Sequence, residues 1–228
     1  SPLPSLKPFA LTLIHYDPLH PLSIPLTLLS LTPIFLFVSY LTLIIFTRRL
    51  TTALLVLGQL SNEALSLILK RLWKGHRPYR GFGEVGDGWG MPSSHSQAAG
   101  FLVAWGIGYA LTDSRRYMLR ENEAQAEVVR RIRAWRKRIY IFGLVLWSVL
   151  VAYSRYHLYY HSPIQIIYGY GVGLIAGSIH FGLTEYIPMF HPNSFLARVR
   201  DAFETVWQGI GGIGGWDIGG TPGGWGEG

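Results

Sequence analysis

The stretch that decides the fold is LTLLSLTPIFLFVSYLTLIIFT, residues 26–47, which contains no charged side chain. A helix needs roughly 20 apolar residues to cross the hydrocarbon core of a bilayer. Four further stretches approach or meet this length, at residues 52–69, 97–112, 139–153 and 163–187. Together they predict an all-α fold, a polytopic membrane bundle of about five transmembrane helices.

The two ends of the chain differ from this apolar middle. Before Leu26, prolines recur so often that a regular helix is disfavoured, and we expect an interfacial or irregular segment there. From Gly209 to Gly228, eleven of the twenty residues are glycine, a composition typical of a flexible tail. The chain therefore divides into an integral-membrane domain at 1–208 and a Gly-rich tail at 209–228. It contains no cysteine, which excludes disulfides and thiolate metal sites.

The basic residues fall unequally on the two sides of the predicted bundle. With five spans, seven of the twenty Lys and Arg residues share the side of the amino-terminal segment, and thirteen lie on the other side. Nine of those thirteen belong to a predicted loop at 113–138. The positive-inside rule places the thirteen-residue side in the cytosol, so the first side faces outward or into a lumen. The net charge of +7 thus reflects membrane topology rather than nucleic-acid binding.

Three polar islands interrupt the apolar chain, and all three fall on the non-cytosolic side. The first is KRLWKGHRP, residues 70–78, in which Lys70 and Arg77 are seven residues apart. Its structural alternative is ordinary flanking charge that reaches the lipid headgroups.

The second island is MPSSHSQ, residues 91–97, directly before the third apolar stretch. Ser94 and Gln97 have the spacing of a capping box. The free N–H groups of a helix start also favour an anion, to which the hydroxyls of Ser93 and Ser94 would add donors. His95 stands beside them as a candidate proton donor.

The third island is SRYHLYYHSPIQ, residues 154–165, before the last apolar stretch. Ser162, Pro163 and Gln165 again fit a helix start, which leaves His161 just outside it. Phosphoryl transfer needs positive charge, a nucleophile and an acid. The positive charge is available from Lys70, Arg77 and Arg155, and the other two roles suit His95 and His161.

These residues resemble the three-part signature of the type 2 phosphatidic acid phosphatase superfamily, over residues 50–187. The matching positions are Lys70, Arg77 and Pro78 in the first motif, Pro92, Ser93, Ser94 and His95 in the second, and Ser154, Arg155 and His161 in the third. The chain departs from the signature at its last position, where Gln165 stands in place of aspartate.

The resemblance implies a metal-independent double displacement that uses no cofactor. His161 would attack phosphorus to form a phosphohistidine, and His95 would protonate the leaving group and later activate water. The phosphate oxygens would be held by Lys70, Arg77, Ser93, Ser94 and Arg155. Gln165 would accept a hydrogen bond from His161 and orient it without supplying charge, or would only cap the helix.

Within the superfamily, the chain is similar to the dolichyl diphosphate phosphatases. The similarity lies in Gln165, in YHLYYHSPIQ at 156–165 and in LSNEALSLILKRLWKGHRP at 60–78. It implies a multi-pass protein of the endoplasmic reticulum membrane, with its site facing the lumen. The expected reaction converts dolichyl diphosphate to dolichyl monophosphate and phosphate, which recycles the lipid carrier of protein N-glycosylation.

Other interpretations of the same residues stay open at this point. The chain could be a broader phosphatase of phosphatidic acid or a sphingoid phosphate, or a non-catalytic protein that binds or transports anionic lipids. A metalloenzyme is disfavoured because the islands offer few carboxylates. His157 and His76 are expected to be bystanders. Glu63, seven residues before Lys70 on the same helical face, is a candidate to steer that lysine.

Overall fold

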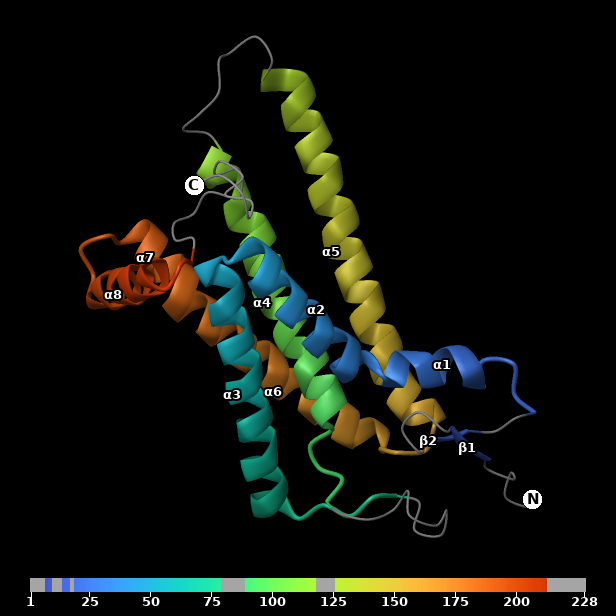
Figure 1. Ribbon diagram of the computed structural model, residues 1–228. Helices are drawn as coiled ribbons and strands as arrows, with labels where there is room; N and C mark the ends of the chain where they lie inside the picture. Colours follow the sequence, from blue (N-terminus) through green and yellow to red (C-terminus); the bar gives the residue numbers. More distant parts are fainter. Residues whose placement is uncertain (1–6, 10–13, 17–18, 79–88, 118–125, 213–228) are drawn as a thin grey trace.

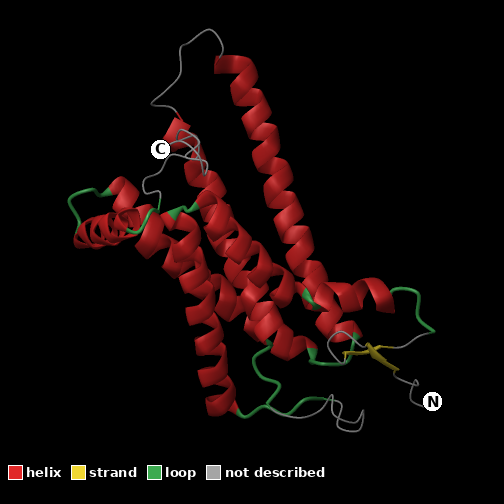
Figure 2. Cartoon of the chain, viewed as in Figure 1, coloured by secondary structure: helices red, strands yellow, loops and turns green. Residues whose placement is uncertain are grey.

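The computed structural model describes residues 7–9, 14–16, 19–78, 89–117 and 126–212, and these residues form a bundle of helices (Figures 1 and 2). A short hairpin comes first, formed by β1 (Lys7–Phe9) and β2 (Ile14–Tyr16), which pair antiparallel. The helices follow in the order α1 (Ser23–Ser30), α2 (Thr32–Thr47), α3 (Leu50–Trp73), α4 (Ser94–Tyr117), α5 (Ala126–His157), α6 (Pro163–Phe181), the π-helix η3 (Gly182–Tyr186), α7 (Ile187–Phe190) and α8 (Phe195–Gly209).

Three helical stretches are long and apolar enough to cross a membrane, which confirms the all-α membrane bundle. They are α3, residues Arg130–His157 of α5, and Pro163–Phe190, which runs through α6, η3 and α7. The bent pair α1 and α2 adds a fourth if it is counted as one span. Helix α4 coincides with the remaining predicted stretch but lies outside this set. It packs against α3, α5 and α6, and therefore meets protein over much of its surface.

The predicted single span at 26–47 is wrong in one respect, because two helices share this segment. Helices α1 and α2 meet near Leu31 at a bend of 46°. Pro33 lies in the first turn of α2, where its missing N–H costs no hydrogen bond but where it cannot continue a helix from before. The amino-terminal segment is also more regular than predicted, since it holds the β1–β2 hairpin and since α1 begins at Ser23.

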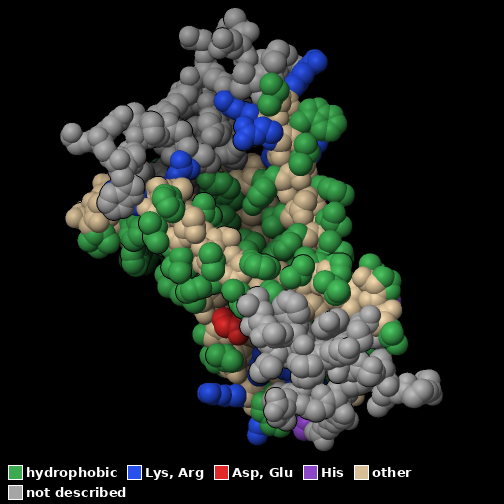
Figure 3. Space-filling view, turned by 45° about the vertical axis from the view of Figure 1, so that its right-hand side comes forward, with side chains coloured by type: hydrophobic (Ala, Val, Ile, Leu, Met, Phe, Trp, Pro, Cys, Tyr) green, Lys and Arg blue, Asp and Glu red, His purple; other side chains and the backbone are tan. Residues whose placement is uncertain are grey.

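The predicted loop at 113–138 is mostly helical. Helix α4 continues to Tyr117 and α5 begins at Ala126, so the basic residues from Arg130 to Arg138 lie on the first turns of α5. Figure 3 shows Lys and Arg side chains gathered at this end of the molecule, beyond a broad hydrophobic band, with a further group at the opposite end.

Glycines bring α4 and α6 into backbone contact. Gly169, Gly173 and Gly177 recur every four residues on α6 and face α4. A β-carbon at Gly173 would lie 2.0 Å from the carbonyl oxygen of Gln97, and one at Gly169 would lie 2.6 Å from that of Ser93. Small residues at this spacing let two helices approach more closely than larger side chains allow. As a result, the start of α4 lies directly against the start of α6.

At the end of the bundle away from the start of α6, helix α8 lies crosswise and is held by buried polar contacts (Figure 1). Arg200 forms an ion pair of 3.5 Å with Glu185 in η3, and its Nη2 donates to Thr51 Oγ1 over 3.4 Å. Trp207 Nε1 donates to the Arg48 carbonyl over 2.7 Å. The sequence patterns did not indicate α8. Most of the predicted Gly-rich tail, from residue 213 on, lies outside the described residues.

Replacing Gly173 with alanine should separate α4 from α6, because its β-carbon has no room beside the backbone of Gln97. We expect a loss of about 1–3 kcal/mol in the free energy of unfolding, as for other overpacked cores. Gly171→Ala is the matched control, since nothing lies within 4 Å of a β-carbon there. Thermal unfolding in detergent compares the two variants. Equal stability of both would contradict the proposed backbone contact.

Candidate active site

The eight residues that the sequence indicated lie together where α3 ends, α4 begins and α5 passes into α6 (Figure 1). Contacts link them into one cluster. Lys70 bonds Ser94, and the N–H of Ser93 donates to the carbonyl of Gln165 over 3.2 Å. The other four members bond residues between them. His95 and Arg155 both bond Ser30. Arg77 bonds the carbonyl of Tyr160, and His161 bonds the carbonyl of Gly90.

His161 lies between α5 and α6 and is 3% exposed. Its Nδ1 is 2.8 Å from the carbonyl oxygen of Gly90 and 3.3 Å from Oε1 of Gln165. Both partners are acceptors, so Nδ1 carries the hydrogen and donates it. A neutral His161 therefore has its lone pair on Nε2, the nitrogen that a nucleophilic histidine needs.

Gly90 contributes its backbone carbonyl to the candidate site, and the sequence patterns missed it. A β-carbon at this position would lie 2.9 Å from Cγ of Arg77 and 3.1 Å from the side-chain amide of Gln165. A glycine therefore lets the backbone carbonyl reach His161 between two members of the site. The sequence shows only that Gly90 stands immediately before the second polar island. Because Gly90 bonds His161 through its backbone carbonyl, no side-chain type marks this contact in the sequence.

Burial, followed by the positive charges of Arg155 and Arg77, lowers the pKa of His161 to about 3. The two hydrogen bonds from Nδ1 act the other way but are outweighed. His161 in the folded protein is therefore neutral at physiological pH, with its lone pair available.

Gln165 both caps α6 and bonds His161. Its backbone N–H donates to Oγ of Ser162, and its Oε1 accepts from the N–H of Ser162 over 3.2 Å, which completes the predicted capping box. Its Nε2 donates to the carbonyl of His76 over 2.7 Å. An aspartate has no N–H to offer that carbonyl, and its side chain is shorter. The glutamine thus links the first polar island to the third.

Three cations gather in the cluster, and none of them forms a salt bridge with a carboxylate among the described residues, although the charge of Glu63 acts on Lys70 from a longer distance. Lys70 Nζ donates to Ser94 Oγ over 2.5 Å, and Arg77 Nη1 donates to the carbonyl of Tyr160 over 3.5 Å. Arg155 is 5% exposed, and its guanidinium carbon lies 4.0 Å from the centre of the Tyr160 ring. The Nε atoms of both arginines are buried without a hydrogen-bond acceptor in the described part of the chain. Buried cations without counter-charge are costly, so this cluster is complementary to an anion.

His95 is held by α1, a helix that the sequence patterns did not connect with the site. Its Nε2 lies 3.1 Å from the carbonyl oxygen of Ser30, to which it donates. The hydroxyl of Ser30 accepts from Arg155 Nη1 over 3.0 Å. Ser30 therefore positions both the candidate acid and one of the cations.

The predicted capping box of Ser94 with Gln97 is wrong. The N–H of Gln97 bonds the carbonyl of Ser93 over 2.9 Å, so the helical hydrogen bonds begin one residue earlier. The side-chain amide of Gln97 donates instead to Asn62, at 3.0 Å from both its carbonyl oxygen and Oδ1. Ser93 is fully buried, and its hydroxyl accepts from that of Ser96.

The other polar residues lie around the cluster. His157 packs against His20 with ring centres 4.5 Å apart, and its Nε2 is 3.5 Å from Ser23 Oγ, as expected for a bystander. The ring of His76 packs near Trp89. Glu63 is exposed on α3, and the ammonium of Lys70 bonds Ser94 rather than Glu63. The steering role of Glu63 stays a prediction.

Comparison with known proteins identifies the family. Residues 50–187 match the model of the PAP2 superfamily. The chain belongs to the PAP2 superfamily. This match covers the motif region and includes every site residue described above, apart from Ser30.

Curated relatives of this PAP2 protein have the name dolichyldiphosphatase. The Saccharomyces cerevisiae protein of that name is 33% identical over 193 residues, which cover 82% of this chain and 74% of the relative. Dolichyldiphosphatase 1 of Dictyostelium discoideum is 34% identical and covers 81% and 74%, and that of Homo sapiens is 32% identical and covers 82% and 76%. No solved structure matches the chain.

Replacing Gln165 with leucine should remove one acceptor from His161 Nδ1 and half of the capping box. We expect kcat for lipid phosphate hydrolysis to fall about tenfold or more with little change in KM, because the imidazole loses its fixed orientation. The lost cap should cost about 1 kcal/mol of stability. Gln165→Glu retains the acceptor and should recover part of kcat. Equal rates for the two variants, or a change in KM alone, would exclude the positioning role.

The low pKa of His161 predicts a pH-dependent stability. Between the unfolded value of about 6.5 and the folded value of about 3, the unfolded chain binds the extra proton, so the free energy of unfolding should decrease as pH falls, by up to about 1.4 kcal/mol per pH unit. His161→Asn should lose less stability than the wild type between pH 7 and pH 5 in thermal unfolding. His157→Asn is the control. An unchanged pH dependence in His161→Asn would refute the depressed pKa.

Proposed function

We propose that this protein hydrolyses dolichyl diphosphate to dolichyl monophosphate and inorganic phosphate. The names of its relatives indicate the substrate. The observation that carries the proposal is the arrangement around His161, in which a neutral imidazole whose Nε2 makes no hydrogen bond in the described residues lies among cations that form no salt bridge there. This arrangement suits the attack of a nitrogen on a phosphate whose negative charge the cations neutralise.

In the proposed first step, Nε2 of His161 attacks the terminal phosphorus of the diphosphate. The N–P bond forms as the bond from phosphorus to the bridging oxygen breaks, and dolichyl monophosphate leaves. The imidazole gains positive charge, which its Nδ1–H shares with the Gly90 carbonyl and with Oε1 of Gln165. These two acceptors stabilise the phosphohistidine without adding a negative side chain.

His95 takes up a proton as the anionic substrate binds, gives a proton to the departing oxygen and then takes one from water. In the second step that water attacks phosphorus, the N–P bond breaks, and phosphate leaves with His161 restored. In the free protein the Nε2 proton of His95 is donated to the Ser30 carbonyl. This bond anchors the ring while the additional proton passes to the leaving oxygen.

The phosphate oxygens are held by Arg77 and Arg155, whose buried Nε atoms are free to donate, and by Lys70. Ser93 and Ser94 contribute hydroxyls at the start of α4. Arginine suits this task because its planar fork binds two oxygens at once. Since these side chains supply the positive charge, the reaction needs no metal ion.

We infer that the site faces the lumen of the endoplasmic reticulum. The basic residues at the start of α5 and the Arg48–Arg49 turn between α2 and α3 lie at the end of the bundle away from the site (Figures 1 and 3). By the positive-inside rule that end is cytosolic. A lumenal phosphatase of dolichyl diphosphate returns the lipid carrier released by N-glycosylation to its monophosphate form.

Phosphate release from dolichyl diphosphate in detergent and excess chelator tests the proposed reaction. We expect the wild type to be active and to prefer this substrate to phosphatidic acid, and His161→Ala to lose at least about 1,000-fold in kcat, as nucleophile variants do. His157→Ala, which changes a neighbouring histidine outside the cluster, is the matched control. An acid-labile phosphoenzyme should be trapped only when His161 is present. Activity that persists in His161→Ala, or that disappears with chelator, would refute the proposed mechanism. Binding of the lipid without its hydrolysis would refute the proposal that the protein is an enzyme.

A further inference from the structure

A long apolar groove runs between α3 and α6. It has a volume of about 530 Å³, and its walls are mainly apolar, with Leu65, Leu69 and Trp73 on the side of α3 and Val172, Ile175 and Ile179 on the side of α6. Ile175 and Ile179 are more than half exposed, so the groove is open along its length to the surface that meets lipid. A groove of this size and lining suits an apolar ligand.

One end of this groove lies beside the phosphate cluster. Leu69 and Trp73 flank Lys70 on α3, and α6 begins two residues after His161. The rings of Trp73 and Tyr168 meet edge to face across this end, with centres 6.1 Å apart. From Trp73 to Gly58 at the far end, helix α3 rises about 22 Å, most of the thickness of a bilayer core.

Polar groups on the walls have partners within the protein. His180 Nε2 donates to the Leu54 carbonyl over 2.9 Å, and the hydroxyl of Ser61 donates to the Leu57 carbonyl over 2.8 Å. The Oδ1 atom and the carbonyl oxygen of Asn62 accept from Gln97. A hydrocarbon chain in the groove would therefore leave none of these groups without a hydrogen bond.

We propose that the groove binds the isoprenoid chain of the substrate, over the units nearest the diphosphate. This inference rests on the function proposed above. A diphosphate held by Lys70 and Arg77 has its hydrocarbon at the mouth of the groove, and the groove leads that chain down into the membrane. The chain exchanges contact with lipid for contact with fixed side chains, which orients the diphosphate relative to His161.

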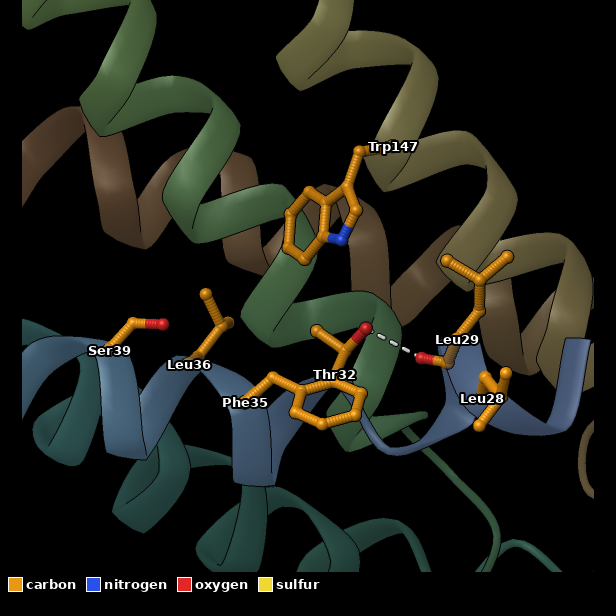
Figure 4. A pocket seen from close by; sticks show the side chains of 7 residues that line it. All are labelled: Leu28, Leu29, Thr32, Phe35, Leu36, Ser39 and Trp147. Carbon is orange, nitrogen blue, oxygen red and sulfur yellow. Dashed lines mark hydrogen bonds between the residues drawn. The ribbon is translucent and has the colours of Figure 1, made fainter. Parts of the chain in front are cut away.

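A second apolar cavity lies on another face of the bundle, between α1, α2 and α5 (Figure 4). Its volume is about 240 Å³, less than half that of the groove, and it is confined to the bend between α1 and α2. Trp147 points into it from α5, and the hydroxyl of Thr32 donates to the Leu29 carbonyl at its wall (Figure 4). It does not continue along a helix pair, so it offers a matched control rather than a path for a long chain.

Plugging the groove tests the proposal. Ser61→Phe should fill it, since the Ser61 hydroxyl bonds only within α3 among the residues that the structure describes, and Val172→Phe should fill it from the opposite wall. Ser39→Phe makes the same change in the second cavity. The readout is the ratio of kcat/KM for dolichyl diphosphate to that for isopentenyl diphosphate, whose five-carbon chain is too short to reach Ser61, about 18 Å along α3 from Trp73.

We expect both groove variants to lower this ratio about tenfold, mainly through KM for the long substrate, and Ser39→Phe to leave it unchanged. An unchanged ratio in Ser61→Phe and Val172→Phe, whether both substrates slow equally or neither slows, would overturn the assignment of the groove. A ratio that falls only in Ser39→Phe would overturn it in favour of the second cavity. Failure of the wild type to hydrolyse either diphosphate would instead contradict the proposed function, so the two failures are distinguishable.

Discussion

The backbone contact between α4 and α6 is the constraint on which the site depends. Each helix begins with one part of the site, and neither part is useful unless the two starts lie against one another. Glycines on α6 remove the side chains that would otherwise hold the helices apart, and the N–H of Ser93 can then bond the carbonyl of Gln165. This contact fixes the height of Ser93, Ser94 and His95 relative to His161. The chemistry is therefore positioned by helix packing rather than by the loops.

The same packing encloses positive charge that the described part of the protein does not neutralise. Arg155 is almost fully buried, and its neighbours are a tyrosine ring, a serine hydroxyl and other cations. Burying these cations without an anion lowers the free energy of unfolding, and a phosphate that binds the folded state raises it again in part. Stability and substrate affinity are thus opposed in this cluster, as they are in other preorganised electrostatic sites. The bonds from Arg155 to Ser30 and from Lys70 to Ser94 limit the cost while keeping the cations in position.

The sequence predicted those features that depend on side-chain type and spacing alone. Long uncharged stretches indicated the membrane bundle because crossing a bilayer requires them whatever the tertiary structure. The eight candidate site residues are brought together because their motifs lie at helix ends on one side of that bundle. The capping box of Ser162 and Gln165 was predicted from spacing, and it formed because both side chains act within one helical turn.

Features that depend on tertiary contacts were missed or wrong. Gln97 had the spacing of a cap residue, but its amide found Asn62 on another helix. Gly90 and Ser30 contribute through backbone carbonyls, which every residue possesses, so no residue type marks them. The bend near Leu31 falls beside Pro33 in the first turn of α2, and apolar composition alone did not show that this proline divides the stretch into two helices.

Gln165 also determines how the site responds to its surroundings. A carboxylate in this place would add a negative charge beside His161 and would lose it only in acid, near its ordinary pKa of about 4. An amide does not ionise, so the bond between Oε1 and Nδ1 keeps its character over the whole physiological range. At the same time Nε2 of Gln165 ties the end of the first motif, at His76, to the start of α6. The glutamine thus fixes the orientation of His161 through bonds to two other segments of the chain, and these bonds do not change with proton concentration.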